Sequence, residues 1–158
     1  GADAEDRLMA VPTQVNSLAL VHPTYVREDE RGSFIEILNR GPWETVITGF
    51  MRPGGILGNH YHKKTRMFLY LLQGSAEIWV RAVRCETDGD CHDNALASVA
   101  RETLATGQGL YLEPNQAHAI RFLEESSFLL LKSRRYSEVD PDTFLYEVMT
   151  GAEVGRSG

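Results

Sequence analysis

The chain consists largely of short runs of Val, Ile, Leu, Tyr and Phe, interrupted at close intervals by Gly, Pro, Asn and Asp. This texture extends from about residue 15 to residue 135 and is typical of strands joined by turns. It predicts an all-β fold, a single antiparallel barrel of the jelly-roll type with little helix. The expected strands are Val15–Val21, Ser33–Asn39, Thr45–Arg52, Asn59–His62, Met67–Leu72, Ala76–Arg84, Val99–Leu104, Gly109–Leu112, His118–Phe122 and Ser127–Ser133.

The polar segment from Cys85 to Ala97 carries several acidic residues and is interpreted as a solvated hairpin extension. Its two cysteines, Cys85 and Cys91, are the only ones in the chain. Their spacing matches neither a CxxC metal knuckle nor a redox pair, so two unpaired loop thiols are expected.

Size and composition predict one domain. A chain of 158 residues with 42% apolar residues buries a sizeable core without a metal or disulfide. We place this domain at residues 15–148, with flexible segments at residues 1–14 and 149–158.

The charge balance argues against nucleic acid as a partner, because 22 acidic residues outnumber 16 basic ones and give a net charge of −6. No apolar run approaches the roughly 18 residues that a membrane span needs, so no membrane partner is expected. The first thirty residues lack a basic start followed by an apolar stretch. A cytoplasmic protein is therefore predicted.

Three of the five histidines, His60, His62 and His118, lie where a barrel can bring them together. His60 and His62 follow a glycine-rich turn and flank Tyr61, so strand alternation places both imidazoles on one face and Tyr61 on the other. His118 follows a turn at the start of a distant strand. Such an arrangement is typical of either a facial metal site or a general-base cluster.

The spacing of these residues resembles the two sequence motifs of the cupin superfamily. The first motif, G(x)5HxH(x)3–4E(x)6G, is matched from Gly54 to Gly74, and the second from Gly109 to His118. Where the family has a glutamate ligand, this chain has Met67, whose thioether does not replace a carboxylate on a hard divalent ion. The resemblance covers roughly residues 33–135 and implies a cupin jelly-roll barrel.

Within the cupins, the chain is most similar to the sugar-nucleotide branch, which includes capsular-polysaccharide epimerase-type cupins and deoxysugar 3,4-ketoisomerases. The likeness is carried by residues 31–36, 58–64, 109–114 and 136–148. It implies an isomerase, epimerase or lyase of polysaccharide or natural-product biosynthesis. The small-molecule substrate would be a nucleotide-linked ketosugar.

The implied reaction is removal of a proton from a carbon beside a carbonyl, followed by epimerisation, isomerisation or dehydration. His60 or His62 would be the catalytic base, since a neutral imidazole suits that step. The developing enolate needs a cationic or hydrogen-bonding partner. The candidates for substrate binding are Lys64, Arg66, Tyr70 and Trp79.

Two alternatives remain open. In the first, His60, His62 and His118 bind one divalent metal, zinc or ferrous iron, in an oxygenase or hydrolase. In the second, the barrel binds a ligand without catalysis. In each case a homodimer is expected, because the apolar segment Val15–Val21 has no obvious partner and cupins commonly pair such edges between subunits.

Overall fold

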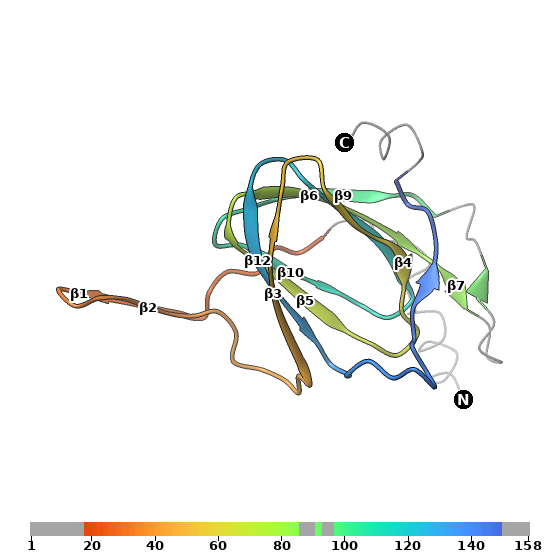
Figure 1. Ribbon diagram of the computed structural model, residues 1–158, viewed down its shortest axis with the longest axis horizontal. Coiled ribbons are helices and arrows are strands. Elements are labelled where there is room, and N and C mark those ends of the chain that lie inside the picture. The colour runs from red at the N-terminus through yellow and green to blue at the C-terminus, as the bar shows by residue number, and fades with distance from the viewer. Residues whose placement is uncertain (1–17, 86–90, 93–96, 150–158) are drawn as a thin grey trace, which may run out of the picture.

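A computed structural model describes residues 18–85, 91–92 and 97–149. This part of the chain contains thirteen strands and no helix (Figure 1). Accordingly, it contains no helix long and apolar enough to cross a membrane. The strands are β1 (Tyr25–Asp29), β2 (Gly32–Glu36), β3 (Thr45–Met51), β4 (Ile56–Tyr61), β5 (Met67–Gln73), β6 (Ser75–Ala82), β7 (Arg84–Cys85), β8 (Cys91–His92), β9 (Ala100–Ala105), β10 (Gly109–Leu112), β11 (Gln116–Phe122), β12 (Ser126–Lys132) and β13 (Phe144–Leu145).

Two antiparallel sheets form the barrel. One has the strand order β10-β5-β12-β3 and the other the order β13-β4-β11-β6-β9. Alternate residues of the strands point inward and make one hydrophobic core, whose fully buried members include Leu69, Ile78, Leu104, Leu110 and Phe122. The predicted all-β jelly-roll fold is confirmed.

Most predicted strands match observed ones within a few residues, and the prediction fails mainly near the N-terminus. Residues 15–17 lie outside the described part, and Leu18–Val21 form no strand apart from one bridge between Val21 and Gly109. Leu18 and Leu20 pack against the core. This segment therefore has a partner within its own chain, contrary to the prediction.

The β1–β2 hairpin extends away from the barrel (Figure 1). Its two strands pair only with each other in the described structure. Strand β1 was not predicted, since its sequence Tyr-Val-Arg-Glu-Asp is mostly polar.

A second, smaller cluster lies on the outer face of the β4-β11-β6 sheet, where the segment after β12 packs. It joins Tyr61 and Trp79 to Val148 and Met149. Met149, assigned to the flexible tail by the sequence prediction, is fully buried. The remaining predicted flexible residues lie outside the described part of the chain.

The predicted hairpin extension is confirmed where it is described, because β7 pairs with β8 and places Cys85 opposite Cys91. The side chains of Cys85 and Cys91 are not among those that the structure describes, so the expectation of two unpaired thiols stays a prediction. His22 is exposed.

Candidate functional site

A β-bulge in β4 determines which side chains face the barrel interior. In the pairing with β11, Ala119 lies opposite Gly58 and His118 lies opposite His60, so Asn59 is the extra residue. Asn59 has a φ of 56°, and Gly58 has a φ of 98°. A side chain at Gly58 would come within 2.6 Å of the His118 carbonyl oxygen, which requires glycine there.

The bulge changes the alternation of β4 by one residue. Leu57 faces the core before it, and His60 faces the same interior after it, while Tyr61 packs on the outer face. If Asn59 were instead part of a regular alternation from Leu57, Tyr61 would point inward and the histidines outward. The predicted placement of His60 and His62 on one face, opposite Tyr61, is confirmed.

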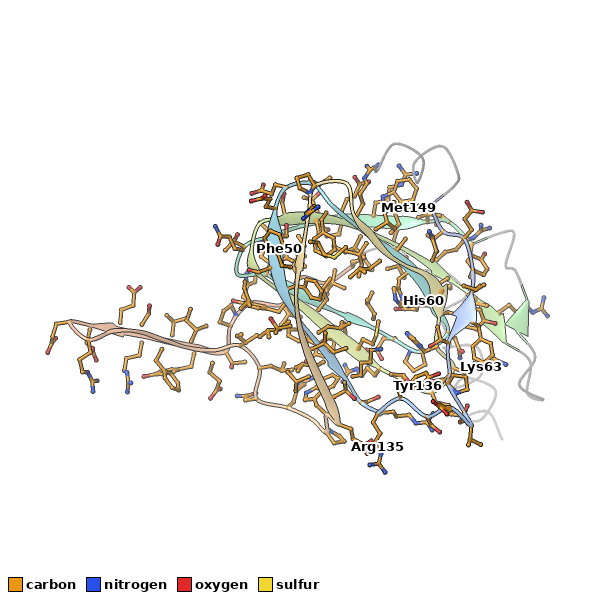
Figure 2. All side chains as sticks on the ribbon, viewed as in Figure 1. Phe50, His60, Lys63, Arg135, Tyr136 and Met149 are labelled. Atoms are coloured by element: carbon orange, nitrogen blue, oxygen red, sulfur yellow. The ribbon has the colours of Figure 1, made fainter. Side chains whose placement is uncertain are left out.

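The three predicted histidines come together inside the barrel at the end of β4. The ring centroids are 4.9 Å apart for His60 and His62, 4.7 Å for His60 and His118, and 5.8 Å for His62 and His118. One nitrogen atom from each ring lies within 4.8 Å of the others. Figure 2 shows His60 on the side of the barrel where Lys63 and Tyr136 also lie.

Two of these rings have fixed orientations. His62 Nδ1 lies 2.6 Å from the carbonyl oxygen of Asp142, and His118 Nδ1 lies 3.3 Å from that of Gln116. A carbonyl oxygen only accepts hydrogen bonds, so each Nδ1 carries the proton and each Nε2 keeps its lone pair. His62 Nε2 is buried without a hydrogen-bond partner among the described residues.

All three imidazoles are neutral at pH 7. Burial, with the neighbouring His62 and Lys132 adding to it, lowers the pKa of His60 to about 4. Burial and the other two imidazoles lower the pKa of His118 to about 3. Burial also lowers the pKa of His62, although the hydrogen bond to Asp142 opposes this effect.

Lys132 is the inward-facing cation of this region, where Arg134 and Arg135 also line the pocket beside His62. It lies opposite Met67 on β5, and Met67 belongs to the inward-facing core, so Lys132 also faces the interior. Its positive charge contributes to the lowered pKa of all three histidines. It has no ion-pair partner among the described residues and lines a small pocket with His62, Tyr136 and Thr143.

The four predicted substrate-binding residues are not brought to the histidines. Lys64 is exposed and forms an ion pair with Asp140 at 2.8 Å. Arg66 forms an ion pair with Glu113 at 2.8 Å and lies 4.0 Å above the ring of Tyr111. The side-chain contacts of Lys64 and Arg66 in the described structure are therefore with other residues, not with the imidazoles.

Tyr70 and Trp79 point away from the barrel interior. Tyr70 lies on the outer face of the first sheet beside Phe68, in an apolar pocket under residues 35–38. Trp79 belongs to the outer cluster of the other sheet, where its Nε1 donates to Glu77 and Arg101 lies 3.9 Å from its ring. Each is one residue out of phase with its inward neighbours, Leu69 and Ile78.

The structure instead adds Lys132, Tyr136 and Asp142 to the site. For Lys132 the sequence held a signal, because strand alternation after the inward Phe128 and Leu130 places it inward. No local pattern pointed to Asp142, which reaches the site through the fold of the C-terminal segment.

Comparison with known proteins is consistent with this architecture. Residues 27–144 match the family described as the polysaccharide biosynthesis C-terminal domain. The chain belongs to this family. No curated protein sequence matches the chain.

Solved structures of similar fold include three sugar-nucleotide or capsule proteins. A dTDP-4-dehydrorhamnose 3,5-epimerase from Sulfolobus tokodaii has a TM-score of 0.64 at 19% identity and covers 85% of this chain and 77% of its own. A mutant of the 3,4-ketoisomerase QdtA from Thermoanaerobacterium thermosaccharolyticum, in complex with TDP-4-keto-6-deoxyglucose, has a TM-score of 0.61 at 18% identity, covering 91% and 96%. The capsular polysaccharide assembling protein CapF from Staphylococcus aureus has a TM-score of 0.54 at 20% identity, covering 78% and 34%. At these identities the likeness shows the fold, which is that of the cupins.

Proposed function

We propose that this chain is an enzyme that removes a proton from the carbon beside a carbonyl in a nucleotide-linked ketosugar. The observation that carries the proposal is the state of His62. Its imidazole is neutral, its Nδ1 is committed to Asp142, and its buried Nε2 is free to accept a proton. The sugar-nucleotide class is supported by family membership and by the epimerase and ketoisomerase of similar fold.

In the proposed reaction, His62 Nε2 takes the proton from carbon. The electron pair of that C–H bond becomes the C=C bond of an enolate, and the carbonyl oxygen gains the negative charge. Lys132, Arg134 and Arg135 line this pocket, and we assign the stabilisation of that oxygen to Lys132 because it faces the barrel interior. A positioned imidazole base contributes about 10²–10⁴-fold to such a step.

The fate of the enolate decides the product. Return of the proton to the opposite face gives an epimer, and protonation of the neighbouring position gives an isomer. Loss of a leaving group from the β carbon gives a dehydrated product. Tyr136 lines the same pocket as His62 and carries a hydroxyl that can donate a proton there.

A metalloenzyme is the second candidate, because three imidazole nitrogens lie within 4.8 Å of one another. Three neutral histidines can hold zinc or ferrous iron, which would act as a Lewis acid on a substrate oxygen. Two features weaken this donor set for a divalent cation. Met67 supplies no carboxylate, and the positive charge of Lys132 faces the same interior.

The test is hydrogen exchange from solvent. The protein is incubated in heavy water with a panel of nucleotide-linked 4-ketosugars, with chelator or with added zinc or iron, and deuterium at each sugar carbon is followed by NMR. We expect uptake beside the carbonyl that persists in chelator and is lost in His62→Gln.

Other results would reject the proposal. Uptake that needs stoichiometric metal would favour the metalloenzyme. Binding of the sugars with no uptake under any condition would favour a ligand-binding cupin.

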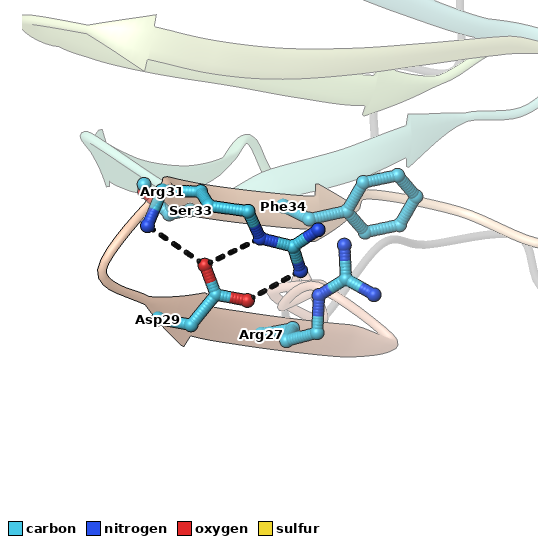
Figure 3. A pocket seen from close by; sticks show the side chains of 6 residues that line it. Arg27, Asp29, Arg31, Ser33 and Phe34 are labelled. Atoms are coloured by element: carbon cyan, nitrogen blue, oxygen red, sulfur yellow. Dashed lines mark hydrogen bonds and ion pairs between the residues drawn. The ribbon is translucent and has the colours of Figure 1, made fainter.

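We also propose that the chain is a homodimer, and the β1–β2 hairpin supports this. Register pairs Val26 with Ile35 on one face and Arg27 with Phe34 on the other. All four are exposed, and Arg27 lies 5.2 Å from the Phe34 ring. Figure 3 shows this second face, with the Arg31–Asp29 ion pair at its end. An isolated two-stranded hairpin with apolar groups on both faces is only marginally stable in water. We therefore propose that a second copy of the chain buries these apolar side chains.

Sedimentation equilibrium tests the dimer. We expect a dimeric mass at micromolar concentration that becomes monomeric in Ile35→Lys, because the introduced charge would have to be buried against the partner. Val139→Lys is the matched control, since Val139 is almost fully exposed outside the hairpin. A wild-type protein of 17.7 kDa at these concentrations would reject the dimer.

A further inference from the structure

We propose that Asp142 is a positioning residue that holds His62 in the Nδ1–H tautomer, with Nε2 aimed into the barrel. The proposal rests on the proposed function for the use of that Nε2 atom as a base. Two parts of the same residue act together, a carboxylate that anchors the chain and a carbonyl that contacts the imidazole.

The carboxylate of Asp142 is held by an array of donors in the segment that follows β4. Oδ1 accepts the backbone N–H of Lys63 at 2.9 Å, and Oδ2 accepts those of Lys64 at 3.0 Å and Thr65 at 2.8 Å. The Thr65 hydroxyl donates to Oδ2 at 2.7 Å. Three successive N–H groups converging on one anion form a strong local anchor. The residue is 4% exposed, so little water competes.

This anchor fixes the Asp142 backbone against the residues that directly follow His62. Asp142 has a φ of 52°, in the left-handed region that aspartate tolerates better than most residues. In that conformation its carbonyl oxygen lies 2.6 Å from His62 Nδ1. The backbone of Lys63, the next residue after His62, is thus hydrogen-bonded to the Asp142 side chain, and the His62 imidazole is hydrogen-bonded to the Asp142 main chain.

The consequence is a choice between two tautomers. With Nδ1 protonated, Nε2 has the lone pair, as a base requires. If the segment moved away, Nδ1 would lose its acceptor and the proton could reside on Nε2 instead. Neighbouring Thr143 Oγ1 lies 3.5 Å from Nδ1, too far to replace the carbonyl.

The tautomer is measured directly by two-bond ¹H–¹⁵N correlation NMR on the full chain labelled at histidine, with His62→Gln used to assign the His62 signals. We expect the wild type to show protonated Nδ1 and unprotonated Nε2. In Asp142→Gly, which keeps the carbonyl and permits the positive φ but removes the anchor, we expect a substantial Nε2–H population. Deuterium exchange into the ketosugar should fall roughly tenfold or more in the same variant.

Asp142→Asn is the conservative variant: an amide oxygen at the Oδ2 position keeps the contacts to Lys64 and Thr65, and only the bond from the Lys63 N–H to Oδ1 is lost. We expect it to restore the Nδ1–H form and most of the exchange rate. Thr65→Val is the structural control, because it removes one hydroxyl donor and stability while leaving the Asp142 carbonyl in place; its tautomer should match the wild type.

The outcomes separate the two proposals. An Nε2–H tautomer in the wild type, or an unchanged Nδ1–H tautomer in folded Asp142→Gly, overturns the positioning role even if exchange proceeds. If Asp142→Gly does not fold, the wild-type tautomer still decides, because an Nε2–H form there overturns the positioning role. A tautomer that shifts as expected in a protein that exchanges no ketosugar supports the positioning role and rejects the proposed function.

Discussion

Lys132 is the residue that bears most on the choice between the two proposed functions. Its inward side chain shares the interior with three neutral imidazoles, and its charge lowers their pKa values. A divalent cation at the imidazoles would be repelled by that ammonium. The same charge favours an enolate oxygen, so the lysine suits metal-independent carbanion chemistry better than metal binding.

We therefore expect Lys132→Met to have two opposite effects. Deuterium exchange should slow by about 10²- to 10³-fold, the usual effect of removing one stabilising donor from a developing oxyanion. Affinity for zinc, measured by titration against a chelating indicator, should rise roughly tenfold or more because the repulsion is gone.

Lys64→Met provides the comparison between the residue proposed from sequence and the one found in the structure. Lys64 is exposed and paired with Asp140, so its removal should leave the rate near that of the wild type. A loss of exchange in Lys64→Met with no loss in Lys132→Met would reverse this assignment.

At the scale of strands, the sequence predicted the fold and the histidine cluster because both depend on local alternation and turn residues. It did not predict that Asn59 is a bulge, although that one residue determines which face of β4 turns inward. The sequence also did not show which alternate residues of β5 and β6 face the core. Tyr70 and Trp79 were therefore predicted to bind substrate, whereas both pack on the outside of the barrel. The role of Asp142 depends on a contact 80 residues away along the chain, which no local pattern encodes.

Asn59 also connects the bulge to the C-terminal segment. Its Oδ1 accepts the backbone N–H groups of Val148 at 2.9 Å and Met149 at 3.0 Å, and its carbonyl accepts that of Tyr146. The side-chain amide therefore stabilises both the left-handed bulge and the segment that covers Tyr61.

Substitution of Asn59 should separate these contributions. Asn59→Gly keeps the backbone conformation and loses two hydrogen bonds, so we expect the free energy of unfolding to fall by about 1–3 kcal/mol. Asn59→Ala loses the same bonds and must also adopt a positive φ, which costs about 1 kcal/mol more. Urea denaturation measures both, and an alanine variant more stable than the glycine variant would contradict the bulge geometry.

At the scale of the whole molecule, burying three neutral histidines makes stability depend on pH. In the unfolded chain each imidazole has a pKa near 6.5, whereas in the folded protein His60 has a pKa of about 4 and His118 of about 3. Between pH 6.5 and 4 the unfolded state therefore binds more protons than the folded state. The free energy of unfolding must fall as pH decreases through this range and gain nothing from these groups above pH 7.

The size of the effect follows from the shifts. The lowered pKa of His60 alone reduces the free energy of unfolding by roughly 3 kcal/mol at the acidic end of this pH range. Solvent screening makes the reduction smaller than this. Loss of part of the net charge of −6 on acidification acts in the opposite direction, because repulsion among carboxylates weakens. That contribution is spread over the surface, whereas the histidine contribution is concentrated in one cluster and can be removed by substitution.

We expect urea unfolding in the presence of chelator to give a clearly lower free energy at pH 5.0 than at pH 7.5. This interval lies above the range in which most carboxylates titrate, so the histidines dominate the difference. In His118→Asn the difference between the two pH values should shrink, because one buried imidazole no longer resists protonation. His22→Asn, a change at an exposed histidine, should leave the difference unchanged. A wild-type protein equally stable at both pH values would contradict the prediction. It would mean that the three rings accept protons in the folded state as readily as in the unfolded chain.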